Sequence, residues 1–225
     1  MSAGIRCPWR EKTMPDANSV GWTATLAGLG ITDALVEIDG PEVPIFDGGA
    51  LPMVESLQRA GVKGLDVPLQ PLVLTMPIQA LDAAGGQIVA MPRPSPGFSL
   101  TYELNYGPRS PIPFQSARWE GDPIRYTKTV APARTFCLRK EAEAMRSLGL
   151  FSHITPKDML VVGDDGKPID NEWRFSDEPA RHKLLDLIGD LALLGQPIQA
   201  DIVANRSGHA LTHAFVKQLK SGGGV

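Results

Sequence analysis

The chain is poor in cysteine, in uninterrupted apolar runs and in net charge. Its two cysteines, Cys7 and Cys137, cannot form the framework of a disulfide-rich domain, and they fit a reducing compartment. Asp186 and Asp190 interrupt the most apolar stretch, so we expect no membrane-spanning segment. A net charge of −3 gives no electrostatic reason to expect binding to nucleic acid or to an anionic membrane surface.

The size and the N-terminal residues set the broad class. A length of 225 residues with 43% hydrophobic residues suits one large globular domain or two small ones. Residues 1–12 carry charges and lack the apolar core of a secretory signal. We therefore expect a cytoplasmic protein, and we expect it to be a monomer.

Apolar periodicity and turn residues predict helices and strands in an irregular order, which favours an α+β layered fold over a doubly wound sheet. A proline-containing segment at 66–71 is the candidate boundary between domains. We expect a disordered tail over 221–225. Strands are predicted at 34–39, 72–76, 87–91, 98–106, 158–162 and 198–204, and helices at 53–60, at 141–148, after Asp177 and after Ser207 as N-cap.

The predicted helix after Asp177 is apolar almost all the way round, as is typical of a buried helix. His182, Asp186 and Asp190 nevertheless follow one another at intervals of four residues, which places them along one flank. A buried carboxylate needs a partner, because an unpaired charge in an apolar interior is very costly. The stripe therefore indicates a metal site or a catalytic site.

His182 and Asp186 have a spacing that lets two ligands on one helical face reach a single metal ion. Nitrogen together with carboxylate suits zinc, with iron as the alternative. The same spacing also occurs in ordinary pairs on a helix surface. The leucine-rich context favours the metal site.

Three further histidines and one threonine are candidate chemical groups. His209, near a predicted helix start, is either a solvent-facing residue or a proton donor that Asp190 holds in its charged form. Thr135 is either a cap or a hydroxyl that donates to a developing oxyanion. His153 and His213 have no evident partner, and we expect both at the surface.

Six segments follow one another in a fixed order: 26–31, 36–48 (VEIDGPEVPIFDG), 97–100, 131–136 (APARTF), 174–191 and 207–211 (SGHAL). Together they resemble one family, the zinc-dependent UDP-3-O-acyl-N-acetylglucosamine deacetylases of lipid A synthesis. The resemblance implies hydrolysis of the substrate acetamide by zinc-activated water, with release of acetate. An insert at about 147–165 would line the passage for the acyl chain.

The resemblance also implies a role for each candidate residue. His182 and Asp186 would be two of three zinc ligands. His209, oriented by Asp190, would stabilise the oxyanion and protonate the leaving amine, and Thr135 would hydrogen-bond the oxyanion. The substrate, UDP-3-O-acyl-N-acetylglucosamine, would be contacted by Lys183 near its diphosphate and by Phe136 and Phe98.

Members of the family fold as a duplicated α/β sandwich, so the resemblance implies two layered domains with helices packed between them. The match starts near Ala24, and the first domain is therefore expected to be incomplete. The implied organisation is an unmatched segment over 1–23, a remnant of the first domain over 24–66 and the second domain, with the zinc-ligand helix, over 67–221.

The chain departs from the family at a Thr-Val-Glu-His-Leu motif, whose glutamate is the general base and whose histidine is the third zinc ligand. Those two places hold Val20 and Gly21, or Gly21 and Trp22 with one deletion, and no Glu-His pair occurs elsewhere. No spacing positions Cys7 or His153 as a substitute. We expect either a frameshift or misassigned start before Ala24, or a remnant that binds a UDP-sugar, an acyl chain or a partner without turnover.

Overall fold

A computed structural model describes residues 20–37, 43–149, 155 and 159–224. Its main element is a six-stranded mixed sheet in which β8 (Ile198–Asn205) is central. β8 is antiparallel to β3 and parallel to β4 and to β1, while β2 and β5 lie at the two ends of the order β2-β3-β8-β4-β5. The remaining strands are β1 (Leu72–Val73), β2 (Ile78–Leu81), β3 (Gln87–Pro92), β4 (Ser99–Leu104) and β5 (Gln115–Trp119).

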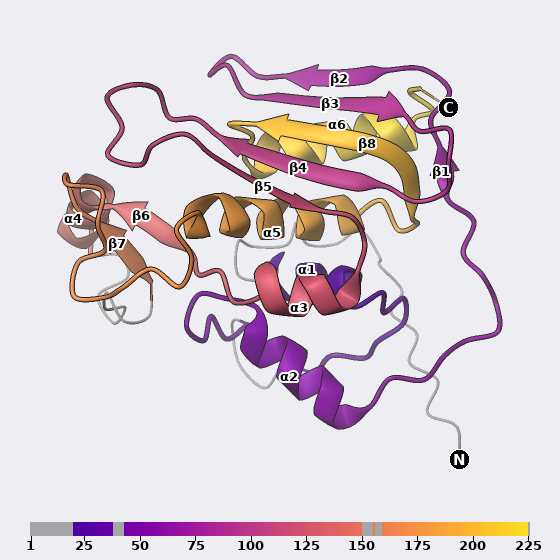
Figure 1. The fold of residues 1–225 in the computed structure, drawn as a ribbon, viewed down its shortest axis with the longest axis horizontal. Helices are drawn as coiled ribbons and strands as arrows, with labels where there is room; N and C mark the ends of the chain where they lie inside the picture. The colour runs from indigo at the N-terminus through magenta and orange to yellow at the C-terminus, as the bar shows by residue number, and fades with distance from the viewer. Residues whose placement is uncertain (1–19, 38–42, 150–154, 156–158, 225) are drawn as a thin grey trace.

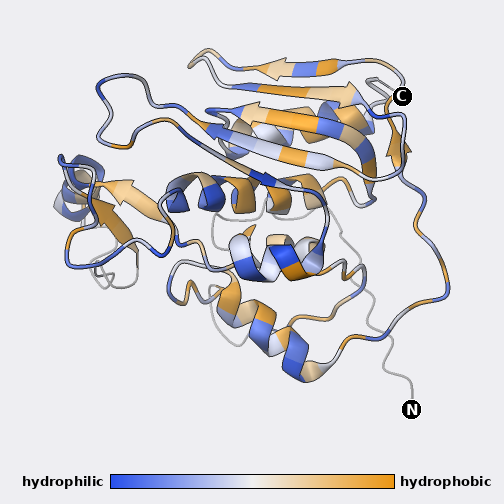
Figure 2. Ribbon diagram, in the orientation of Figure 1, coloured by the Kyte–Doolittle hydropathy of each residue, from blue (hydrophilic) through white to orange (hydrophobic). Residues whose placement is uncertain are grey.

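Alternation along the strands gives the sheet one buried face. In β8, Ile198, Ala200, Ile202 and Ala204 are buried, while the residues between them are partly or fully exposed. Apolar and polar residues alternate along several strands of the sheet (Figure 2). Two helices, α5 (Glu178–Ala192) and α6 (His209–Lys220), pack on the sheet and on each other (Figure 1).

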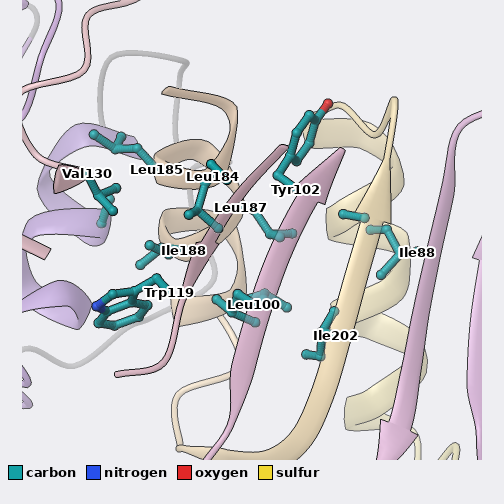
Figure 3. Packing of buried hydrophobic residues seen from close by; sticks show 14 of the residues in the cluster. Ile88, Leu100, Tyr102, Trp119, Val130, Leu184, Leu185, Leu187, Ile188 and Ile202 are labelled. Carbon is teal, nitrogen blue, oxygen red and sulfur yellow. The ribbon is translucent and has the colours of Figure 1, made fainter. Parts of the chain in front are cut away.

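α5 lies between the sheet and a group of shorter helices, which explains why it is apolar on nearly all sides. Leu184 and Leu187 point toward the sheet near Leu100, and Ile188 points toward Trp119 (Figure 3). Its opposite side packs against α1. The shorter helices are α1 (Val20–Gly28), α2 (Leu51–Ala60) and α3 (Pro123–Thr129) (Figure 1).

α1 and α5 approach closely at Gly189. A β-carbon built there would lie 2.6 Å from the backbone oxygen of Val20 and 2.9 Å from Oγ1 of Thr23. Only glycine allows this separation between the two helices. The contact places Val20 beside the stretch of α5 that runs from Asp186 to Asp190.

A separate β-α-β unit lies at one end of α5 (Figure 1). β6 (Phe136–Leu138) and β7 (Leu160–Val162) form a two-stranded parallel sheet, and α4 (Arg139–Ser147) follows β6 directly. The predicted insert at 147–165 begins at the last residue of α4 and extends past β7. Part of it falls outside the described residues, as does His153.

Most predicted elements are confirmed, including the α+β class. The helices predicted at 53–60, at 141–148 and after Asp177 correspond to α2, α4 and α5, and five of the six predicted strands correspond to β1, β3, β4, β7 and β8. Within the described ranges, no helix is long and apolar enough to cross a membrane. The division into domains at 24–66 and 67–221 stays a prediction.

Three local predictions are wrong. Residues 34–37 form no strand, because no strand in the described part of the chain pairs with them, and Leu35 is 64% exposed. The last helix starts at His209 with Gly208 as its N-cap, and the Ser207 carbonyl instead accepts a hydrogen bond from Tyr102. The tail is ordered through Gly224, whose carbonyl accepts from the backbone N–H of Thr75 at 2.8 Å.

Candidate active site

A cavity of about 980 Å³ lies where α5, the start of α6, the β6-α4-β7 unit and the loop after β4 meet. Segments far apart in the chain contribute to its wall, and six of the eight predicted site residues line it. These residues are Thr135, Phe136, His182, Lys183, Asp186 and His209. The cavity is therefore the candidate active site.

The other two predicted residues lie outside the cavity wall. Asp190 is 1% exposed, and its side chain is hydrogen-bonded to the ring of His209. Phe98 packs edge-on against Trp119, with ring centroids 5.3 Å apart, and it is not among the residues that line this cavity. Its expected contact with the substrate stays a prediction.

His182 lines the cavity, and its ring is held so that Nδ1 is engaged and Nε2 lies beside Asp186. Its Nδ1 lies 3.1 Å from the backbone oxygen of Ala133, and since a carbonyl only accepts, Nδ1 carries the proton. Burial lowers the pKa of His182, which favours the neutral imidazole, although the nearby Asp186 opposes this shift. A backbone carbonyl on the second nitrogen is typical of histidines that bind metals.

Asp186 lies one helical turn further along α5. Its Oδ1 is 3.5 Å from Nε2 of His182, and its Oδ2 accepts from Nζ of Lys183 at 2.7 Å. Burial alone would raise the pKa of Asp186, but the charges of Lys183 and His182 outweigh burial and lower it. Burial would likewise lower the pKa of Lys183, but Asp186 raises it overall. Both side chains are therefore charged at neutral pH.

These two donors fit a zinc ion. Nε2 of His182 and Oδ1 of Asp186 are adjacent, and an imidazole with a carboxylate is a donor set that zinc accepts. In the described portion of the chain, no group of three or more His, Cys, Asp or Glu side chains is arranged to hold a metal ion. Among the described residues, the site thus offers two candidate metal donors, His182 and Asp186.

Asp190 joins α5 to α6 through two imidazoles. Its Oδ2 lies 2.9 Å from Nδ1 of His209, and its Oδ1 lies 3.0 Å from Nε2 of His213. The hydrogen bond from His209 to Asp190 raises the pKa of His209, against the effect of partial burial. The surface position predicted for His213 is wrong, because the turn of α6 after His209 faces Asp190, and the His213 side chain is 12% exposed.

Thr135 lies in the segment that enters β6. Its backbone N–H donates to the carbonyl of Gly48 at 2.7 Å, and its own carbonyl accepts from Leu160 at 3.0 Å. The segment is fixed by a buried ion pair next to it, between Arg134 and Glu178. Glu178 is fully buried and accepts from Nε of Arg134 at 2.8 Å and from the Arg134 backbone N–H at 3.1 Å.

Sequence reasoning missed two supports of this site. The Arg134–Glu178 pair anchors the segment that carries the Ala133 carbonyl and Thr135. Arg134 occurs in the matching segment 131–136 and Glu178 in the matching segment 174–191. Tyr102 donates to the Ser207 carbonyl at 2.7 Å, two residues before His209. The alternation of apolar and polar residues in β4 places Tyr102 on the buried face, and this pattern could have indicated that its hydroxyl needs a hydrogen-bond partner.

Comparison with known proteins matches residues 22–221 to the family model described as UDP-3-O-acyl N-acetylglycosamine deacetylase, LpxC. The chain is 40% identical over 196 residues to the UDP-3-O-acyl-N-acetylglucosamine deacetylase of Anaeromyxobacter dehalogenans, covering 87% of this chain and 62% of that protein. It is 35% identical over 198 residues to the enzyme of the same name from Leptospira biflexa, covering 88% of this chain and 64% of the relative. The chain therefore spans somewhat less than two thirds of these relatives.

Proposed function

This chain belongs to the UDP-3-O-acyl N-acetylglycosamine deacetylase family, and we propose that it hydrolyses the acetamide of UDP-3-O-acyl-N-acetylglucosamine in lipid A synthesis. One observation carries the proposal: His209, which is hydrogen-bonded to the buried Asp190, lines the same cavity as His182 and Asp186. Metal-assisted amide hydrolysis uses both a proton donor and metal donors around one cavity, and these residues supply those two parts. We place the enzyme in the cytoplasm as a monomer.

His182 and Asp186 would hold zinc, which when bound polarises the amide carbonyl and activates water near neutral pH. The Ala133 carbonyl fixes the His182 ring so that its Nε2 faces the cavity. Lys183 neutralises the second oxygen of Asp186, which leaves Oδ1 available. These contacts support a two-ligand zinc site on α5.

His209 supplies the proton that the departing amine needs. Its Nδ1 is engaged by Asp190, so Nε2 is the nitrogen available to the cavity. The raised pKa keeps a larger fraction of His209 protonated at neutral pH, where it also stabilises negative charge on the tetrahedral carbon's oxygen. The Thr135 hydroxyl is the second donor to that oxygen.

Two further lining residues suit other parts of the substrate. Lys183 carries positive charge at the cavity wall and would attract the diphosphate. Phe136 lies edge-on to the His182 ring, with centroids 6.5 Å apart, and offers an apolar surface for the sugar or the acyl chain. Phe98 would contact the substrate beyond this cavity.

A second candidate function is binding of the same substrate without turnover. It rests on the sequence at α1, where the places of the family's Glu-His pair hold Val20 and Gly21, or Gly21 and Trp22 with one deletion. None of these side chains binds zinc or accepts a proton. Loss of a general base typically slows a reaction by about 10²- to 10⁴-fold.

One experiment separates the two functions. The purified chain is incubated with zinc and UDP-3-O-acyl-N-acetylglucosamine, and the free amine is measured alongside binding by calorimetry. The first proposal predicts zinc-dependent amine release that His182→Ala and His209→Gln abolish. Binding without amine release would overturn it in favour of the second function, and neither binding nor release would reject both.

A further inference from the structure

His213 shares a buried carboxylate with His209. Asp190 is 1% exposed and lies between α5 and α6, with one oxygen toward each ring. The His213 side chain is 12% exposed and that of His209 is 36% exposed. The inner imidazole therefore faces the carboxylate, and the outer one faces both the carboxylate and the cavity.

The chemistry of the carboxylate fixes which nitrogens carry protons. An ionised carboxylate only accepts hydrogen bonds, so Nε2 of His213 and Nδ1 of His209 both donate to Asp190. A buried carboxylate with unsatisfied oxygens is costly, and the His213 donor satisfies Oδ1. Oδ2 is thereby left to His209.

Charged groups from two helices surround this pair. Asp190, Asp186 and Lys183 of α5 affect the pKa of His209, and Lys140 and Glu141 of α4 line the same cavity. The two rings lie 6.3 Å apart between centroids and are tilted by 39°, so they do not stack. His213 acts on His209 chiefly through the carboxylate that both contact.

We propose that His213 is a positioning residue that fixes the Asp190 carboxylate and limits the negative charge it presents to His209. By donating to Oδ1, it draws charge away from Oδ2 and weakens the hold of Asp190 on the His209 proton. A proton donor held less tightly gives up its proton more readily to a leaving amine. That catalytic consequence rests on the proposed function, whereas the charge sharing does not.

The test follows the His209 ring by ¹⁵N NMR from pH 5 to 10, without zinc or substrate. The chain has four histidines, so single substitutions assign every ring. His213→Phe removes the donor and keeps a planar ring, while His213→Gln keeps an N–H at nearly the same reach. His213→Leu is a second donor-free variant, and thermal unfolding checks that each variant is folded.

The donor-free variants are expected to raise the pKa of His209 by about 0.1 to 0.6 unit, because neighbouring hydrogen bonds change one another's strength by about 10–30%. His213→Gln is expected to stay within about 0.1 unit of the original chain. An unchanged or lower His209 pKa in the donor-free variants would overturn the proposal. Failure of deacetylation would leave this titration result unaffected, so the two proposals fail separately.

Discussion

The protonation of His209 depends on one buried carboxylate, so it ties stability to pH. Its pKa in the folded chain is raised above the ordinary value of 6.5 by the hydrogen bond to Asp190. The bond therefore stabilises the fold fully below pH 6.5, and this contribution disappears as the pH rises through the raised pKa. His209→Gln is expected to lose more stability at pH 5.5 than at pH 9.

Urea unfolding of the original chain and of the His209→Gln variant between pH 5.5 and pH 9 measures how the loss of stability changes with pH. The comparison isolates His209, because the other titrating groups are common to the two chains. Equal losses at all pH values would contradict the link between Asp190 and the charge of His209.

Glu178 is a buried charge that we expect to be indispensable for stability. It accepts hydrogen bonds from Arg134 and from the backbone N–H of Arg174 at 2.6 Å. Glu178→Gln leaves the guanidinium of Arg134 without its counter-charge, and breaking a buried pair in this way costs about 3–5 kcal/mol of unfolding free energy. Chemical denaturation gives the value directly.

The matched control for Glu178→Gln is Glu120→Gln. Glu120 pairs with Arg118 at 2.8 Å, but both side chains are about half exposed, at 47% and 54%. A surface pair of this kind contributes at most about 1 kcal/mol. Similar losses in the two variants would show that burial of the Arg134–Glu178 pair is not what matters.

At the scale of elements, the contact between α1 and α5 depends on one missing side chain. A methyl group at Gly189 would lie 2.6 Å from the Val20 carbonyl and 2.8 Å from its Cγ1. Gly189→Ala therefore forces the two helices apart and is expected to cost about 1–3 kcal/mol, although alanine favours helix formation. Hydrogen exchange should show that α1 loses protection before the sheet does.

Gly64→Ala serves as the control for this substitution. No heavy atom lies within 4 Å of a β-carbon placed at Gly64 in the described structure. We expect its unfolding free energy to stay within about 0.5 kcal/mol of the original. A Gly189→Ala chain as stable as this control would mean that α1 can shift without cost.

Elements with their own periodicity could be predicted from sequence, and elements defined by distant partners could not. The apolar character of α5 on nearly all sides and the alternation of buried residues in β4 and β8 are local patterns, and the structure confirms them. Residues 34–37 alternate equally well but have no neighbouring strand within the described residues. Such a segment becomes a strand only when it hydrogen-bonds to a neighbouring strand, and its own sequence does not show whether that neighbour exists.

The same division holds for the site. His182, Asp186 and Asp190 share a helical flank that the spacing reveals. His213 could not be predicted, because its partner Asp190 is 23 residues away on another helix, and the sequence around His213 gives no sign of it. Packing of α6 on α5 creates that contact.

At the scale of the whole molecule, the cavity is assembled from α5, α6 and the β6-α4-β7 unit, and α1 packs on the opposite side of α5 from the sheet. α1 meets α5 at Gly189, between Asp186 and the end of the helix. Val20, which takes the place of the family's glutamate in the gap-free alignment, therefore lies beside the helix that carries the two proposed zinc donors, and Gly21 is the next residue of α1. This proximity suggests that zinc binding can be strengthened from α1.

We expect the double substitution Val20→Glu with Gly21→His to tighten zinc binding by about tenfold or more, because a third ligand joins His182 and Asp186. The neighbour nearest to a side chain at position 21 is the terminal methyl of Met53 at 3.1 Å, which can move aside. Val20 is buried, so the new carboxylate should lower stability without zinc and regain it with zinc. Competition with a chromophoric chelator gives the affinities, and thermal unfolding with and without zinc gives the stabilities.

The control for this experiment is the same double substitution combined with His182→Ala. If the new histidine acts together with the α5 donors, the control loses most of the gain in affinity, since Asp186 is then the one α5 donor left to share the ion. A gain that survives in the control would mean that zinc binds elsewhere. No gain in the double variant would mean that α1 does not present these two positions to the cavity, and the alignment of Val20 and Gly21 with the Glu-His motif would then be wrong.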